Sequence, residues 1–323
     1  MRNKRNSKRN KIKLLAFILT VASIAVILNK SQSANHAINQ RTNNSLKNVV
    51  ESALIGAKGT YGIVVKNLKT GEAYSINAHK VYEPGSLYKI WVMATAFVKI
   101  QNGILKADEL LSEDVNVLSD KFNISSKTAE MTEGIITLTV NQALEQMITI
   151  SHNYATLLLM ERIKRSSINS FLAKNGFNES SLGEPPHSTP YDIALFFEKL
   201  YKGELVDQEH TNRMLNLLKK QKLNDKLPKH LPKDTVVAHK TGEINFFSHD
   251  AGIVFLDEGD YMIVVLSETN SWVSANERIA KISKAVYDYF TNRNKSVFEK
   301  RHSERIRQLT DLVGMTNFCL FYL

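Results

Sequence analysis

The sequence predicts an α/β fold of the α+β class, in which an antiparallel sheet flanked by helices is joined to an all-helical lobe. Short β-branched segments separated by turn residues occur at 60–76 and again at 235–267. Between them, apolar residues recur three and four positions apart, which is the period of helices. We therefore expect the two ends of the domain to form one layer and its middle to form a second lobe, with a candidate site in the crevice between them.

The strands are predicted from alternation and turn chemistry. Residues 61–65 are apolar and β-branched, residues 73–76 alternate, and residues 67–71 supply the turn between them, which indicates a hairpin. A strand at 235–239 precedes a second hairpin at 251–267.

The first helix is predicted after Gly85. Ile90, Met93 and Phe97 recur at helical spacing, and Gly103 ends the segment. Further helices are predicted at 140–149, 154–164, 168–174, 191–201, 208–218 and, with a long amphipathic pattern, 276–289.

The N-terminal segment predicts export. A basic tip precedes an apolar run at 14–28, which is the layout of a secretory signal or a signal anchor. The run is short for a membrane-spanning helix of about 17–25 residues, so cleavage and retention as an anchor both stay open. Cys319 is the only cysteine, which excludes a disulfide within one chain.

The net charge of +10 first suggests a nucleic-acid partner. Eight positive charges and no acid lie in the first 34 residues, so the rest of the chain carries only +2. We therefore expect no nucleic-acid partner. The predicted divisions are a signal or anchor at 1–34, a tether at 35–48, a catalytic domain at 49–292 (sheet lobe 49–82 and 235–292, helical lobe 83–234) and a tail at 293–323.

Ser86 and Lys89 form an S-x-x-K motif at the start of the first long helix. At this spacing, the Lys89 amine lies one turn from the Ser86 hydroxyl and can reach it. A serine is a weak nucleophile without an adjacent base, and a lysine fills that role when burial and nearby positive charge keep its amine neutral. The alternative is a helix-capping serine followed by a solvated lysine.

Ser151, His152 and Asn153 stand at the start of another predicted helix. Alone, this is a common capping pattern. In the functional interpretation, Ser151 passes a proton to a leaving nitrogen, and the Asn153 amide holds Lys89 and a substrate carbonyl. We expect His152 to be structural or to face outward.

Lys240, Thr241 and Gly242 directly follow the strand predicted at 235–239. A lysine and a hydroxyl on a strand edge can bind a carboxylate, and Gly242 lets a substrate backbone approach closely. The backbone N–H of Glu243 is the expected second oxyanion donor beside that of Ser86. A surface turn is the alternative, but the order of the three motifs favours the functional interpretation.

With these motifs, residues 49–291 resemble the class A serine β-lactamase family and its penicillin-binding relatives. Residues 188–192 resemble the family's T-T-P-x-D helix start, and residues 250–254 resemble its strand after K-T-G. The resemblance implies a β-lactamase/transpeptidase-like fold. It also implies roles for six residues: nucleophile Ser86, activating amine Lys89, proton relay Ser151, and recognition by Asn153, Lys240 and Thr241.

The chain departs from the family in the loop before residue 190. Class A β-lactamases carry an E-x-x-L-N loop whose glutamate drives deacylation through a held water. Glu184 is the nearest carboxylate in the shorter loop here and is the candidate for this base, while Glu179 begins an E-x-x-L match in an earlier part. Neither position matches the family glutamate, so acylation is expected and the speed of deacylation stays open.

The residues are consistent with two classes of function. The first is a β-lactamase-type hydrolase that breaks down β-lactam antibiotics through an acyl-enzyme at Ser86, with D-Ala-D-Ala peptidase action on peptidoglycan as the alternative chemistry. The second is a non-catalytic domain that binds β-lactams or peptidoglycan stem peptides. We expect no metal, no cofactor, and a monomer outside the cytoplasm, either membrane-anchored or secreted (periplasmic).

Overall fold

The computed structural model describes residues 46–125, 129–257 and 259–292. By its internal contacts the chain divides into two units, residues 1–47 and 48–323, and every element below lies in the second unit. The predictions for 1–34, for most of the tether and for the tail at 293–323 fall outside the described residues. Within the described ranges, no helix combines the length and apolar character needed to cross a membrane.

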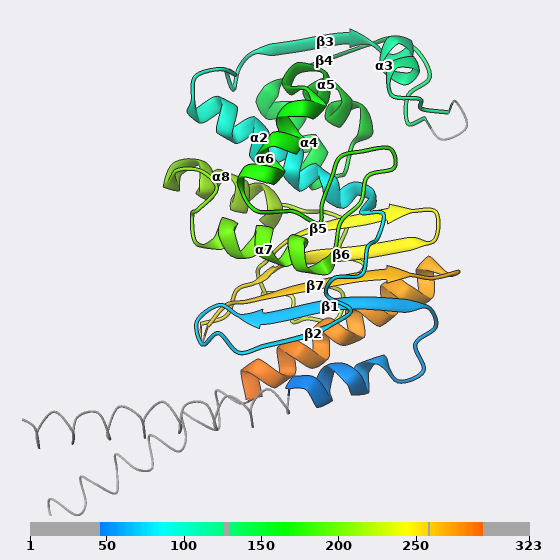
Figure 1. Cartoon of the computed structure of the whole chain (residues 1–323), viewed down its shortest axis with the longest axis vertical. Helices are drawn as coiled ribbons and strands as arrows, with labels where there is room; N and C mark the ends of the chain where they lie inside the picture. Colours follow the sequence, from blue (N-terminus) through cyan, green and yellow to red (C-terminus); the bar gives the residue numbers. More distant parts are fainter. Residues whose placement is uncertain (1–45, 126–128, 258, 293–323) are drawn as a thin grey trace, which may run out of the picture. The chain divides into compact units, whose positions relative to one another are not determined.

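A five-stranded antiparallel sheet joins the two ends of the domain, as the sequence predicts (Figure 1). The strand order is β2-β1-β7-β6-β5, so β5 is an edge strand. Because the sheet pairs β1 with β7, segments some 200 residues apart in sequence become neighbours. The strands are β1 (Thr60–Asn67), β2 (Ala73–Ile76), β5 (Val237–Ile244), β6 (Phe247–Val254) and β7 (Tyr261–Glu268).

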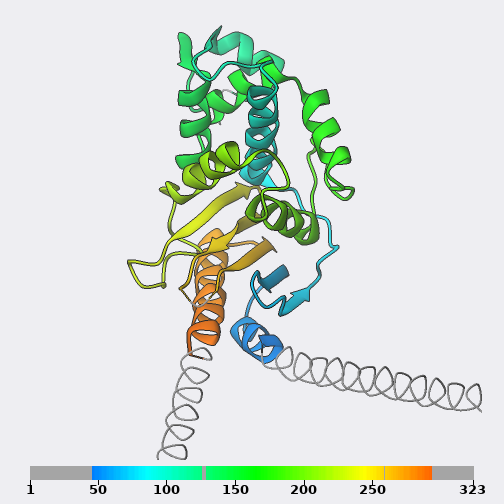
Figure 2. The ribbon, with the colours of Figure 1, turned by 90° about the vertical axis from the view of Figure 1, so that its left-hand side faces the viewer.

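Helices cover the sheet on both faces (Figures 1 and 2). The helix at 272–292 packs on one face, and α7 (Pro190–Tyr201) packs against β7 and β1 on the other. Arg278 Nη1 donates to the Ala53 carbonyl at 2.6 Å, which ties Ala53 to the helix at 272–292. Coverage on both faces explains why β6 and β7 are buried along almost their whole length.

The middle of the chain forms the predicted helical lobe, with α2 near its centre (Figure 2). Nine residues of α2 are buried, including its first residue, Lys89. The bounds of α4 agree with the prediction, and those of α5, α6 and α8 differ by up to three residues. The helices are α2 (Lys89–Gln101), α3 (Val115–Lys121), α4 (Val140–Thr149), α5 (Asn153–Ile163), α6 (Arg165–Lys174) and α8 (Gln208–Lys219).

The structure corrects the strand pattern in three places, the first being that the second hairpin begins with β6 at Phe247 rather than at residue 251. The strand predicted at 235–239 continues to Ile244, so the K-T-G motif lies inside β5 rather than after it. Lysine and glycine have low strand propensity, which hid the continuation. A small hairpin of β3 (Leu110–Asp114) and β4 (Ile135–Thr139) in the helical lobe was not predicted, because each strand is only five residues long and half-exposed.

Candidate active site

Ser86 lies in a 3₁₀ turn, η1 (Gly85–Tyr88), that runs directly into α2 at Lys89. The sequence analysis placed Ser86 at the start of the helix itself. In the structure the α-helix begins one turn later, at Lys89. In 3₁₀ geometry, side chains three residues apart eclipse, so Ser86 and Lys89 project on the same side. Ser86 is half-buried, and no side chain caps this N-terminus. The turn therefore presents both a hydroxyl and uncapped backbone N–H groups.

Two glycines bring η1 into backbone contact with β5. Gly85 has φ +50°, and a Cβ there would lie 2.8 Å from the backbone nitrogen of Glu243. A Cβ at Gly242 would lie 2.4 Å from the Pro84 carbonyl oxygen. Only glycine permits this approach. β5 is an edge strand, so one side of it pairs with no further strand of the sheet. The contact places Ser86 beside that unpaired side.

The Ser151 hydroxyl joins the three motifs. Lys89 Nζ lies 3.1 Å and Lys240 Nζ lies 3.0 Å from Ser151 Oγ. Lys89 also donates to the Ser151 carbonyl oxygen and, at 2.7 Å, to Asn153 Oδ1. Among the hydrogen bonds of the described residues, none links Lys89 to Ser86. The Lys89 amine is thus bound by residues 151–153, while the three-residue spacing keeps Lys89 on the same side of the turn as Ser86.

Ser151 itself adopts an unusual backbone conformation. Its φ is +61°, in the left-handed region that residues other than glycine rarely occupy. Such a conformation costs about 1–3 kcal/mol and tends to occur at functional sites. Here it allows one residue to offer both its carbonyl oxygen and its hydroxyl to Lys89.

Burial changes the ionisation of both lysines. It lowers the pKa of Lys89 to about 7, although the negative charge of Glu130 acts in the opposite direction. Burial lowers the pKa of Lys240 well below its usual value, and the nearby Lys89 cation lowers it further. Because both amines contact one oxygen, protonating both is unfavourable. The site can therefore hold a neutral amine near neutral pH.

Asn153 and His152 have different roles at the start of α5. Asn153 is exposed, and its Oδ1 accepts from Lys89, which leaves its amide nitrogen available to a ligand. His152 Nδ1 accepts from the backbone nitrogen of Ala155 at 3.3 Å and caps the helix. His152 is thus structural, one of the two roles that the sequence suggested.

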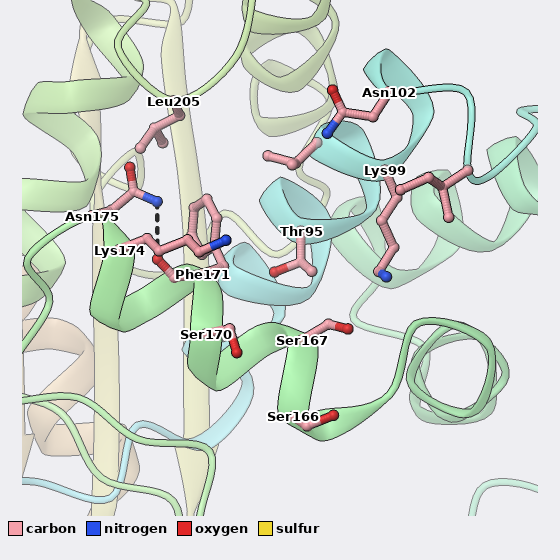
Figure 3. Close-up of a pocket in the computed structure, with 12 residues that line it drawn as sticks. Thr95, Lys99, Asn102, Ser166, Ser167, Ser170, Phe171, Lys174, Asn175 and Leu205 are labelled. Atoms are coloured by element: carbon pink, nitrogen blue, oxygen red, sulfur yellow. Dashed lines mark hydrogen bonds between the residues drawn. The ribbon is translucent and has the colours of Figure 1, made fainter.

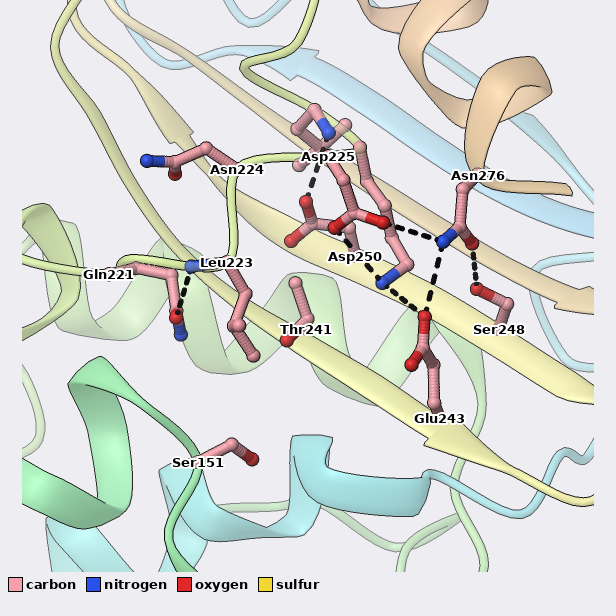
Figure 4. Close-up of polar contacts among 12 residues, drawn as sticks. Ser151, Gln221, Leu223, Asn224, Asp225, Thr241, Glu243, Ser248, Asp250 and Asn276 are labelled. Carbon is pink, nitrogen blue, oxygen red and sulfur yellow. Dashed lines mark hydrogen bonds and ion pairs between the residues drawn. The ribbon is translucent and has the colours of Figure 1, made fainter. Parts of the chain in front are cut away.

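A polar cluster with several buried members lies beside the K-T-G segment of β5 (Figure 4). The Lys226 side chain is 2% exposed and pairs with Glu243 Oε1 at 2.7 Å. His239 Nδ1 lies 2.9 Å from Asp250 Oδ1, and both residues are buried. Asn276 Nδ2 lies 3.2 Å from Glu243 Oε1, so the Glu243 carboxylate is engaged while its backbone nitrogen faces η1. Sequence analysis missed Lys226, since no motif surrounds it.

Comparison with known proteins identifies the family of this chain. The family model described as "Beta-lactamase enzyme family" matches residues 42–290, which is more than half of the chain. The chain belongs to this family. The resemblance inferred from the three motifs and the serine β-lactamase-like hydrolase that it implies are confirmed.

Related β-lactamases match most of this chain. It is 25% identical over 271 residues to a β-lactamase of Bacteroides uniformis, covering 75% of this chain and 90% of that protein. It is 24% identical over 280 residues to β-lactamase VEB-1 of Pseudomonas aeruginosa, covering 79% and 92%.

Solved structures confirm the β-lactamase/transpeptidase-like fold. PBP-A is similar with a TM-score of 0.68 and 22% identity, covering 77% of this chain and 96% of PBP-A. A class A β-lactamase of Bacteroides cellulosilyticus DSM 14838 has a TM-score of 0.67 and 22% identity, covering 78% and 99%.

The loop that differs from the class A pattern holds its two glutamates in other contacts. Glu184 is exposed and pairs with Arg165 Nη1 at 2.6 Å. Glu179 accepts from Thr189 Oγ1 at 2.7 Å and contacts His79 at 2.8 Å, which anchors the loop to the start of α7. The assignment of Glu184 as deacylation base stays a prediction.

Replacing Glu184 by glutamine should therefore change nitrocefin turnover by less than about fivefold, because an exposed ion pair contributes at most about 1 kcal/mol. Steady-state kinetics of the full chain measure this, with Glu179→Gln beside it to report on the loop anchor. A long-lived acyl adduct in Glu184→Gln alone would instead assign the base to Glu184.

A hollow lies away from the motif residues, between α2 and α6 (Figure 3). It has a volume of about 420 Å³ and is lined by Lys99, Lys174 and several hydroxyl side chains. None of the motif residues lines it, so we assign it no part in the reaction. In the described ranges, no three His, Cys, Asp or Glu side chains are grouped to hold a metal ion.

Proposed function

We propose that this chain hydrolyses β-lactams through an acyl-enzyme at Ser86. The observation that carries the proposal is the meeting of Lys89 and Lys240 at the Ser151 hydroxyl, at 3.1 and 3.0 Å. This contact brings a base, Lys89, and a cation, Lys240, to the hydroxyl of the proton relay, Ser151, beside the Ser86 turn. Each motif alone has a plain structural explanation, whereas their convergence does not.

In the acylation step, Ser86 Oγ attacks the lactam carbonyl carbon and its proton passes to the neutral Lys89 amine. The backbone N–H groups of Ser86 and Glu243 hold the negative oxygen of the tetrahedral intermediate. When the C–N bond breaks, the leaving nitrogen takes a proton from Ser151. Lys89 then returns its proton to Ser151, so no net charge is left on the relay.

The same geometry favours a substrate with a carboxylate. Lys240 is fully buried, and its charged form is destabilised by burial and by Lys89. A substrate carboxylate beside Lys240 and Thr241 would stabilise the ammonium form and fix the carbonyl over Ser86. The amide nitrogen of Asn153 would hold a substrate side-chain carbonyl.

Deacylation is proposed to be slow. The chain lacks the E-x-x-L-N glutamate, and the glutamates of the shorter loop are engaged by Arg165 and Thr189. This loop also favours the alternatives, a D-Ala-D-Ala peptidase or a non-catalytic peptidoglycan-binding domain. A mutant of PBP-A has been solved as an acyl-enzyme complex with penicillin G, which supports trapping at this stage in a protein of this fold.

We also propose that the domain works as a monomer outside the cytoplasm. Support for the location comes from the basic tip and the apolar run at 14–28, a layout that would keep the tip in the cytoplasm and export the rest of the chain. Retention of this segment would attach the domain to the membrane surface, close to peptidoglycan. Its removal would release a secreted or periplasmic form.

Mass spectrometry of the full chain mixed with penicillin G tests the function. We expect a covalent adduct of one penicillin per chain that decays slowly, and no adduct on Ser86→Ala. Rapid decay would indicate an efficient β-lactamase, and release of D-alanine from a D-Ala-D-Ala peptide would favour the peptidase. A wild-type chain that forms no adduct with any β-lactam contradicts the proposal.

A further inference from the structure

Glu130 is a carboxylate that no motif singled out, yet it contacts the S-x-N turn. It lies in the segment between α3 and β4. Its Oε2 accepts a hydrogen bond from the backbone nitrogen of Asn153 at 2.7 Å. Asn153 is the first residue of α5, where backbone N–H groups have no partner within the helix and an anion is favoured.

A second contact anchors the same segment. The hydroxyl of the buried Tyr154 donates to the Met131 carbonyl oxygen at 2.8 Å and lies 2.7 Å from Ser119 Oγ. Two successive residues of the segment, Glu130 and Met131, thus bond two successive residues of α5, Asn153 and Tyr154. The carboxylate is bound at Asn153 and its neighbour in the segment is bound at Tyr154, so the partly exposed Glu130 side chain is kept at the start of α5.

His152 does not donate a hydrogen bond to the Glu130 carboxylate. Its Nδ1 accepts from the Ala155 backbone nitrogen, so in this tautomer that nitrogen carries no proton. The 3.4 Å contact between His152 Nδ1 and Glu130 Oε2 is then no hydrogen bond. The negative charge of Glu130 stays directed at the site.

The charges that act on Lys89 come from two sides. Lys240 on β5 reaches the same serine oxygen, and Glu130 acts from the segment before β4, where its charge raises the pKa of Lys89 against the effect of burial. Tyr88 stays neutral, because burial raises its pKa to about 12. The remaining charged neighbours act on Lys240: Asp250, Lys226 and Glu243.

We propose that Glu130 is a positioning residue of the active site, which fixes the start of α5 against Lys89 and sets the pH range in which Lys89 exchanges a proton with Ser86. The proposal rests on the proposed function, because it assigns that proton exchange to acylation. It adds a carboxylate that belongs neither to the three motifs nor to the loop before residue 190. Its charge and its hydrogen bond can be separated by substitution.

The first test is a direct titration of Lys89 in the full chain by NMR of ¹³C-labelled lysine, with the signal assigned from its loss in Lys89→Met. Glu130→Gln keeps an acceptor for Asn153 and removes the charge, so the titration midpoint should fall by about half a pH unit or more. Glu133→Gln is the matched control, since Glu133 is exposed in the same segment. It should leave the midpoint unchanged.

The second test is the pH dependence of acylation by nitrocefin. In Glu130→Gln the acidic limb should move to lower pH by the same amount as the midpoint. Glu130→Ala should also lose about tenfold in maximal rate, because Asn153 loses its anchor. If Glu130→Ala fails to fold, Glu130→Gln still decides.

Superimposable titrations of Glu130→Gln and the wild type would overturn the proposal, even if overall rates fell. Failure of the proposed function is recognised separately. In that case no β-lactam acylates the wild type, while the NMR midpoint still shows whether Glu130 acts on Lys89.

Discussion

Replacing Lys89 by methionine is expected to lower the rate of Ser86 acylation by about 10²- to 10⁴-fold, the usual contribution of a positioned base. Methionine has a similar length and suits a buried site, so the loss should reflect the amine rather than a cavity. The change also leaves Ser151 Oγ with Lys240 as its remaining lysine partner. The relay is then present without the group that accepts the serine proton.

The pH profile provides a sharper signature of the same amine. Burial lowers the pKa of Lys89 to about 7, and the neutral form is the active base. The acylation rate should therefore rise with pH up to about 7, by tenfold per unit on the acidic side, and then level off. In Lys89→Met the residual rate should lose this rise.

Stability should depend on pH in the same direction. The pKa of Lys89 is lower in the folded chain than its ordinary value of 10.5, so between about pH 7 and 10.5 the unfolded chain binds more protons. The free energy of unfolding should then increase with pH across that window. Lys89→Met should flatten part of the slope, since the lowered pKa of Lys240 contributes with the same sign.

Stopped-flow acylation with nitrocefin and chemical unfolding across this pH range measure both effects. Lys99→Met is the control, since Lys99 lies on the same helix, is half-buried and pairs with Glu204 at 3.8 Å. A Lys89→Met chain that acylates at a rate close to the wild type would assign the base to another group.

The sequence predicted residues that the fold brings together, because its motifs lie on regular elements. Ser86 and Lys89 are one turn apart, and spacing alone fixes their common side. Lys240 directly follows the predicted strand, and the order of the three motifs along the chain indicated that it belongs to the site. Such relations are local, so they can be inferred without knowledge of tertiary contacts.

Groups that act from irregular segments could not be found in this way. Glu130 reaches the site through two hydrogen bonds between a loop and α5, and neither leaves a sequence pattern. Lys226 is recognisable only by its burial, because a lysine in a polar loop is ordinarily solvated. The left-handed backbone of Ser151 was equally hidden, since its hydrogen bonds to Lys89 depend on packing between distant segments.

Replacing Gly242 by alanine is expected to reduce kcat/KM for nitrocefin by about 10²-fold, the effect of misplacing reacting groups by about 1 Å. The new Cβ would lie 2.4 Å from the Pro84 carbonyl oxygen and 3.1 Å from the Leu87 backbone nitrogen. These are backbone atoms of the turn that carries Ser86, so they cannot yield by a side-chain rotation. The turn and β5 must separate, which moves Ser86 away from the Glu243 N–H.

The separation should also cost about 1–3 kcal/mol of stability, as overpacking of a close contact does. Gly183→Ala is the matched control, because its Cβ would meet its nearest neighbour at 3.5 Å, an ordinary contact. Nitrocefin kinetics and thermal unfolding of both variants provide the comparison. If Gly242→Ala loses stability while its kcat/KM stays within threefold of the wild type, the close backbone contact between the turn that carries Ser86 and β5 is not required for the reactivity of Ser86.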